Sequence, residues 1–377
     1  MKAKSIKGNS AEEIQAALQQ TMVDGFNPTL AVIFAHIGLD RNAIGSMFTC
    51  AGIAVFGATT NGGFIDENID MDASAVLLLD VNKEYFAIML KEYPERNFRD
   101  VAARLAEETL RQFARPAFLI AGSNIETDAE QLLFGFEDVV GKEVNIYGCM
   151  AGDNVTFTEQ FVFTNDKQSN CGIVMLAFDE DKIQIKGRAT CGWKAVGTER
   201  TVTRSEGNHV YTVDDVPVLD LTAKYGGIEL REQADFSVEI ASQFPLQLQR
   251  EKGDPVMRPG LLIDWGDHSF YCSGSVPQGS KIRFSLPPDF DVIEKVIDEC
   301  KNLKATEVPE ADAIITFSCA GRLMTLGPLM GEEIEGVQKV WNVPMAGMFS
   351  NAELARATGG NLEMHNCTAC VVALKEK

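Results

Sequence analysis

One short segment combines a thiol and a guanidinium directly after an apolar run. Residues 318–322 read Ser-Cys-Ala-Gly-Arg. A thiol close to a cationic side chain can have a depressed pKa and act as a nucleophile. Arg322 can instead bind a carboxylate or phosphate through two parallel hydrogen bonds. In the simplest alternative, Cys319 packs in the interior and Arg322 pairs with Glu332 or Glu333, and the residues alone leave these readings open.

The four histidines, at positions 36, 209, 268 and 365, offer two further kinds of chemistry. His365 could act as the base for a Cys319 nucleophile, as in a cysteine-dependent hydrolase. One of the histidines could ligate a haem iron. A lone histidine is more often a structural hydrogen-bonding residue, so both hypotheses remain alternatives.

The sequence contains a single Cys-x-x-Cys pair, formed by Cys367 and Cys370. The pair lies on or beside a predicted strand, where residues three apart face opposite sides of the sheet. This spacing disfavours a metal or redox site built from these two thiols.

Two loops of small and polar residues follow predicted strands. The first, residues 57–63, contains Thr59, Thr60 and Asn61, which could hold a small polar ligand or cap the next turn. The second, residues 148–153, contains Cys149 and ends in Asp153, which is most simply a turn-former. Glycines in such loops allow close approach of the backbone to another group.

The elements that position these residues occur in one order, three times: strand, helix, strand, small-residue loop, strand. The pattern predicts an α/β (mixed α+β) fold, with mixed sheets flanked by helices and two lobes that meet at a cleft. A strand-rich region follows the second copy, and the best domain boundary is near Tyr225. The three copies span residues 29–79, 116–178 and 313–374.

Composition excludes several classes of partner. The 377 residues carry 54 acidic and 34 basic side chains, a net charge of −20. Such a surface repels nucleic acid and anionic membranes. No apolar run reaches the roughly 18 residues of a membrane span, and the basic start of the chain has no apolar segment behind it. Nine scattered cysteines are typical of a reducing compartment, so we expect a cytoplasmic protein.

Several of these motifs, in this order, resemble the FIST family (F-box and intracellular signal transduction). Residues 57–62 are similar to its Gly-Cys-Ser-Thr-x-Gly loop, with Ala58 and Thr59 in place of the cysteine and serine. Residues 318–322 are similar to Ser-Cys-x-Gly-Arg, and residues 365–368 to His-Asn-x-Thr. The resemblance implies a FIST N domain over residues 1–225 and a FIST C domain over residues 226–377.

The resemblance implies sensing rather than enzymatic turnover. We expect a stand-alone sensor that binds a small polar metabolite, such as an amino acid, and signals through a partner protein such as a histidine kinase. No cofactor is expected, with a haem-based nitric-oxide sensor as the alternative. Arg322 would bind a ligand carboxylate, and Glu353 an amine. The expected ligand-binding residues are Thr59, Thr60, Asn61, Cys149, Asp153, Ser318, Cys319, Arg322, Glu353, His365 and Asn366.

Overall fold

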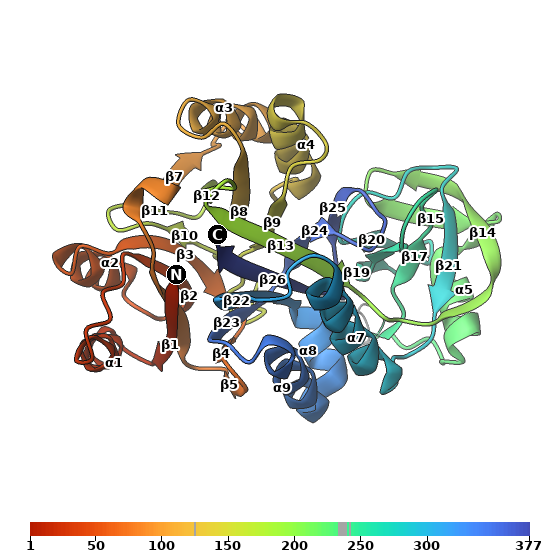
Figure 1. The fold of residues 1–377 in the computed structure, drawn as a ribbon. Coiled ribbons are helices and arrows are strands. Elements are labelled where there is room, and N and C mark those ends of the chain that lie inside the picture. The colour runs from red at the N-terminus through yellow and green to blue at the C-terminus, as the bar shows by residue number, and fades with distance from the viewer. Residues whose placement is uncertain (124–125, 233–239, 241–242) are drawn as a thin grey trace.

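A computed structural model describes residues 1–123, 126–232, 240 and 243–377. The chain builds three similar units, and a further domain is inserted into the third (Figure 1). Each unit contributes one six-stranded sheet, and the inserted domain contributes an eight-stranded one.

The first unit shows how local sequence sets the elements. Ser10 caps the first helix by accepting from the Glu13 N–H, as the predicted capping box requires, while the Glu13 carboxylate accepts from the N–H of Asn9, one residue before the cap. Asp40 caps the second helix. The elements are β1 (Lys2–Gly8), α1 (Ala11–Met22), β2 (Leu30–His36), α2 (Arg41–Cys50), β3 (Ala54–Thr60), β4 (Gly63–Ile65), β5 (Asn68–Asp70) and β6 (Ser74–Asp80).

The second and third units repeat this order. The second contains η1 (Lys83–Tyr85), β7 (Phe86–Glu92), α3 (Phe98–Leu110), β8 (Pro116–Gly122), α4 (Ala129–Val140), β9 (Ile146–Met150), β10 (Val162–Phe163), β11 (Gln168–Ser169) and β12 (Gly172–Asp179). The third contains β13 (Ile183–Thr190), α7 (Asp291–Thr306), β22 (Ala313–Cys319), α8 (Ala320–Leu326), η2 (Gly327–Leu329), α9 (Met330–Trp341), β23 (Met345–Ser350), β24 (Ala352–Arg356), β25 (Leu362–His365) and β26 (Ala369–Glu376).

Strand pairing is the same in all three units, which confirms the predicted repeat. The central strand runs parallel to the strand that follows the helix, as β2 with β3, β8 with β9 and β22 with β23. It runs antiparallel to the closing strand of its unit, which is β6, β12 or β26. Such a parallel pair needs a crossover connection, and a helix supplies it each time.

The units are interlocked by exchanged hairpins. The β4–β5 hairpin of the first unit extends the sheet of the third, through β23. The β10–β11 hairpin of the second unit extends the first sheet through β3, and the β24–β25 hairpin of the third extends the second sheet through β9. Each six-stranded sheet is therefore completed by residues of another unit.

The inserted domain lies between β13 and α7 and forms the second lobe of the molecule (Figure 1). Its strongly curled sheet encloses a separate apolar core. The predicted division at 225/226 falls at the end of α5, inside this domain. Its elements are β14 (Ala195–Glu206), β15 (His209–Val213), β16 (Val216–Pro217), α5 (Val218–Gly226), β17 (Leu246–Leu248), β18 (Val256–Arg258), β19 (Gly260–Asp264), β20 (Ser269–Cys272) and β21 (Lys281–Ser285).

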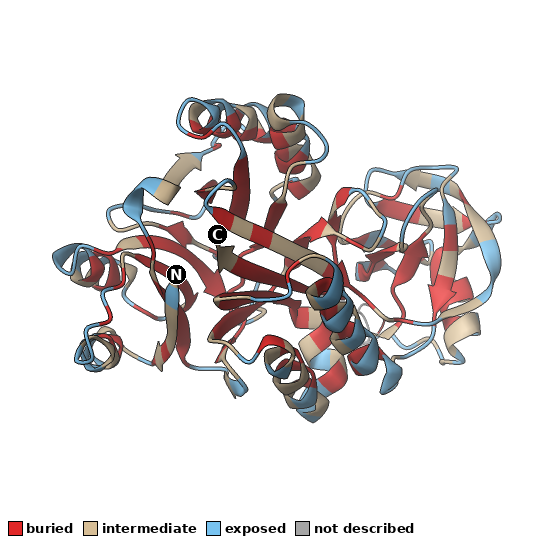
Figure 2. Ribbon diagram, viewed as in Figure 1, coloured by how far each residue is buried: buried red, intermediate tan, exposed pale blue. Residues whose placement is uncertain are grey.

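The three repeat sheets pack their inner faces against one another and form a shared core. Phe34 of the first sheet meets Phe317 of the third edge-to-face, with ring centroids 5.7 Å apart. Helices cover the outer faces, each over its own smaller core, so buried strands lie inside and half-exposed helices outside (Figure 2). None of the helices in the described ranges combines the length and apolarity that crossing a membrane requires.

Candidate functional site

The small-residue loops of the three units meet one another at the centre of the repeat body. Each donates a backbone N–H to a carbonyl of another unit, so the loops form a closed ring of contacts rather than opposite walls of one cleft. These hydrogen bonds run from Asn61 to Phe349 (2.9 Å), from Asn351 to Met150 (3.1 Å) and from Gly152 to Thr59 (2.8 Å).

Asn61 and Asp153, two of the predicted binding residues, are held by this ring. The Asn61 amide oxygen accepts from the N–H groups of Asp153 (2.9 Å) and Val155 (2.8 Å), while its nitrogen donates to the Asn351 oxygen (2.8 Å). Burial alone would raise the pKa of Asp153, but its hydrogen bonds hold that pKa below the usual value. The donors to its carboxylate are the backbone N–H groups of Phe157, Thr158 and Glu159 and the side chains of Thr158 and Gln160.

Thr59, Thr60 and Cys149 are buried and also contact protein groups. The Thr59 hydroxyl accepts from the Phe161 N–H (2.9 Å), and the Thr60 hydroxyl accepts from the Gly62 N–H (3.1 Å). The Cys149 thiol lies 3.4 Å from the Met348 sulfur. These contacts stabilise the strand ends, and a ligand role for the three residues stays a prediction.

Arg322 adopts the structural pairing that the sequence offered as its alternative. Its guanidinium is fully buried and forms a salt bridge with buried Glu333, with Nε 2.7 Å from one carboxylate oxygen. Burial opposes its charge, yet Glu333 raises the pKa of Arg322. The remaining donors reach the backbone carbonyls of Cys191, Val292 and Cys367. Arg322 therefore ties α8 to α9, to α7 and to the segments that follow β13 and precede β26, rather than presenting its donors to a ligand carboxylate.

Glu353 and His365 are both buried inside the protein. The Glu353 carboxyl meets the hydroxyls of Ser350 (2.7 Å) and Thr368 (2.8 Å), and burial raises its pKa well above the usual value. Burial lowers the pKa of His365 to about 3, and its Nε2 lies 3.1 Å from the Ala355 carbonyl. His365 is thus engaged on β24, and the expected pairing with Cys319 as nucleophile and base is not observed.

The other three histidines also have protein partners. His36 contacts Asn154, His209 contacts Ser269, and His268 contacts Asp220. No histidine is among the described residues that line the cavity between the repeat body and the inserted domain. A histidine-ligated haem would therefore lack its axial ligand among these lining residues, and haem binding stays a prediction.

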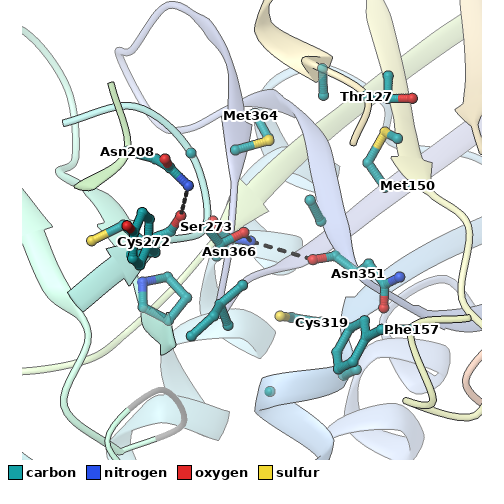
Figure 3. A pocket seen from close by; sticks show the side chains of 18 of the residues that line it. Thr127, Met150, Phe157, Asn208, Cys272, Ser273, Cys319, Asn351, Met364 and Asn366 are labelled. Carbon is teal, nitrogen blue, oxygen red and sulfur yellow. Dashed lines mark hydrogen bonds between the residues drawn. The ribbon is translucent and has the colours of Figure 1, made fainter. Parts of the chain in front are cut away.

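A cavity of about 610 Å³ lies where the second unit, the third unit and the inserted domain meet (Figure 3). This volume suits a small organic molecule. Of the predicted residues, Cys319 and Asn366 line it, whereas Ser318 lies behind the wall, with its buried hydroxyl unpartnered within the described ranges. Its walls include Thr127 and Met150 from the second unit, Asn208 and Ser273 from the inserted domain, and Cys319 and Asn366 from the third unit.

Asn366, which lines this wall, carries a buried acceptor without a partner in the described ranges. Its amide nitrogen donates to the Ser273 hydroxyl (3.1 Å) and to the Asn351 carbonyl (3.4 Å). Because a carbonyl only accepts, the second contact fixes which end of the amide is nitrogen. Asn366 is only 1% exposed. Its amide oxygen is buried and has no hydrogen-bond partner among the described residues. A buried acceptor of this kind is costly to leave unpaired.

The charge of the lining is negative. Glu126, Asp128 and Glu130 contribute carboxylates, and the lining residues in the described ranges include no lysine, arginine or histidine. Glu130 pairs with Arg258 behind the wall, at 2.6 Å. A cationic or neutral ligand suits this wall better than an anionic one.

Sequence reasoning found one wall of the cavity and missed the others. Ser273 and Asn208 lie in the inserted domain, far from Asn366 in the chain, and carry no motif. Met150 lies next to the predicted Cys149, but the alternation of the strand sends these two side chains to different cores. Only the tertiary structure brings these residues together.

These features define an α/β protein of three interlocked repeats, with a barrel-like insertion and a ligand-sized cavity where the two parts meet. The chain belongs to the FIST family: the FIST N domain matches residues 29–216 and the FIST C domain matches residues 219–356. These domains are associated with signal transduction and the sensing of small ligands. A search of curated proteins finds no match to the chain.

Proposed function

We propose that this protein is a sensor that binds a small molecule in the cavity between the repeat body and the inserted domain. The observation that carries the proposal is the buried Asn366 oxygen, which has no partner within the described ranges. A ligand N–H or O–H group that donates to this oxygen would satisfy it. The expected function is binding rather than turnover.

The charge of the wall narrows the ligand class. Glu130 pairs with Arg258 and Glu126 with Arg96, so Asp128 is the lining carboxylate that favours an amine-bearing molecule. The buried Arg322 has its donors engaged elsewhere. The proposed ligand is therefore a small polar metabolite that binds through a cationic or neutral donor, not through a carboxylate. An amino acid would satisfy this through its ammonium group.

The position of the ligand suggests how binding would be signalled to a partner protein. One molecule in the cavity would contact both the repeat body and the inserted domain, and so would favour one arrangement of the two. A partner protein, such as a histidine kinase, would then recognise that arrangement.

A ligand screen with two variants tests the proposal. Thermal shift and calorimetric titration with small amines should identify a binder, and Asn366→Leu should weaken it by roughly tenfold to a hundredfold, the value of a hydrogen bond to a charged group. Thr127→Val is the matched control, since its hydroxyl also lines the cavity but already contacts Tyr93 and Ser123. It should leave affinity unchanged.

Three outcomes would contradict the proposal: no stabilisation by any amine or neutral donor, equal affinity in Asn366→Leu, or tighter binding of carboxylates. The same purified protein tests the haem alternative, because loaded haem would give a Soret band in its visible absorption spectrum.

A further inference from the structure

Two thiols meet on the cavity wall. Cys319 ends β22 and Cys367 precedes β26, and both line the cavity. The Cys319 N–H donates to the carbonyl of Thr368 at 2.9 Å, one residue from Cys367. Regular strand alternation would turn Cys367 away. A backbone φ of 56° instead puts Cys367 in the left-handed region, and Cys367 lines the same cavity as Cys319. Strained residues of this kind concentrate at functional sites.

The environment of Cys319 favours its thiolate. The Cys367 thiol donates to the Cys319 sulfur and, despite burial, lowers the pKa of Cys319 to about 6, with backbone N–H groups of Gly321 and Arg322 assisting. The same contact raises the pKa of Cys367. By contrast, burial raises the pKa of Cys272, on the same cavity wall, to about 12. Cys319 thus combines cavity access with the reactive form of the thiol.

The geometry points to a thiol–disulfide exchange site in which Cys319 and Cys367 reduce a small-molecule disulfide bound in the cavity. The Cys319 thiolate attacks one sulfur of the disulfide, forms a mixed disulfide and releases the other half as a thiolate. Cys367 then attacks the Cys319 sulfur, passes its proton to the departing sulfur and closes the Cys319–Cys367 disulfide. The two protein thiols lose two electrons, and the small disulfide becomes two thiols.

The charge of the wall sets the expected substrate class. Because the lining carries the carboxylate of Asp128 and no lysine, arginine or histidine in the described ranges, a disulfide bearing amines should react faster than one bearing carboxylates. The proposal uses the same cavity as the sensor role but does not depend on reversible ligand binding, because covalent exchange is detected by mass.

The second unit supplies a matched control. Ser123 donates its N–H to the Gly172 carbonyl at 2.9 Å, so Ser123 and Cys171 occupy the places of Cys319 and Cys367. The exposed Cys50 reports the reactivity of an unassisted thiol.

The experiment treats the full chain with cystamine at pH 7 and maps the products by mass spectrometry without reduction. The wild type should form a Cys319–Cys367 disulfide, and Cys367→Ser should hold a stable adduct on Cys319. Cys171→Ser should behave as the wild type. The exchange rate should be half-maximal near pH 6 in the wild type and shift towards about pH 8.5, the ordinary thiol pKa, in Cys367→Ala, which removes the donor.

Adducts confined to Cys50 and Cys171 would overturn the proposal, as would equal rates at Cys272 and Cys319. Oxidised glutathione, which carries carboxylates, should react at least about tenfold more slowly than cystamine, and equal rates would refute the assigned substrate class. If Cys367→Ala fails to fold, the Cys367→Ser adduct on Cys319 still decides the outcome.

Discussion

The second and third units place equivalent residue pairs at the end of their central strands, and the two pairs have different surroundings. In the second unit the Ser123 hydroxyl accepts from the Gly172 N–H (2.9 Å), and the Cys171 thiol contacts the Tyr93 carbonyl (3.6 Å). In the third unit both Cys319 and Cys367 line the cavity. One strand end is closed by protein partners, whereas the other faces space that a small molecule can occupy.

The candidate site residues predicted from the sequence also fall into two groups, those with buried protein partners and those that line the cavity. Asp153, Arg322 and Glu353 have buried protein partners, whereas Cys319 and Asn366 line the cavity. Residue type alone does not separate the two groups, because a carboxylate or guanidinium serves equally well in a core or in a site. The hydrogen-bond partners of each side chain separate the two groups. A buried polar group that lacks a protein partner needs a partner from a ligand or water.

The largest expected effect on stability is at Arg322, one of the candidates that has buried protein partners. Arg322→Met should reduce the free energy of unfolding by about 3–5 kcal/mol, because it leaves Glu333 charged, buried and unpaired. Urea denaturation followed by circular dichroism measures this. The double variant Arg322→Met/Glu333→Leu should recover part of this loss. The recovery is incomplete because the backbone carbonyls that accept from Arg322 still lack donors. A single variant as stable as the wild type would contradict the structural role.

A smaller loss of stability is expected at Asp153. Comparing it with Asn366 sets a candidate with protein partners against one that lines the cavity. Asp153→Ala should cost about 2–3 kcal/mol, since its carboxylate accepts several hydrogen bonds from its loop. Asn366→Ala should cost less than about 1 kcal/mol in the absence of ligand, because it also removes an unsatisfied oxygen. Matched thermal and urea unfolding curves measure both. A larger loss for Asn366→Ala than for Asp153→Ala would contradict the distinction between candidates with protein partners and candidates that line the cavity.

The third effect, at Glu353, depends on pH. Its pKa is raised in the folded protein, so the folded state retains a proton that the unfolded chain loses above about pH 4.5. The stabilisation from this proton is complete below that pH and is lost as pH rises, by at most about 1.4 kcal/mol per pH unit. Glu353→Gln stays neutral, so its stability relative to the wild type should increase from pH 5 to pH 8. A constant difference across this range would mean that Glu353 ionises normally.

Local patterns predicted much of the fold. The repeated order of strand, helix, strand, loop and strand follows from apolar runs and caps, and each predicted unit forms the same pairing in the structure. The exchange of hairpins was not predicted, because strands of two or three residues, such as β10 and β4, carry too little periodicity to reveal their partners.

The candidate site was predicted only in part. Cys319 and Asn366 were found through motifs that lie on the cavity wall. Ser273 and the unpartnered oxygen of Asn366 could not be found, because they depend on how the inserted domain packs against the third unit. Arg322 was expected to bind a ligand, since nothing local distinguishes a clamp from a buried ion pair.

The exchanged hairpins have a consequence for the order of events during synthesis. The sheet of the first unit needs β10 from the second, the second needs β24 from the third, and the third needs β4 from the first. A nascent chain that has emerged only as far as β12 therefore exposes β9 without its antiparallel neighbour. Contacts this distant in sequence slow folding, and unpaired strand edges invite aggregation. Ribosome-bound intermediates of this protein should therefore depend on chaperones until β24 has been made.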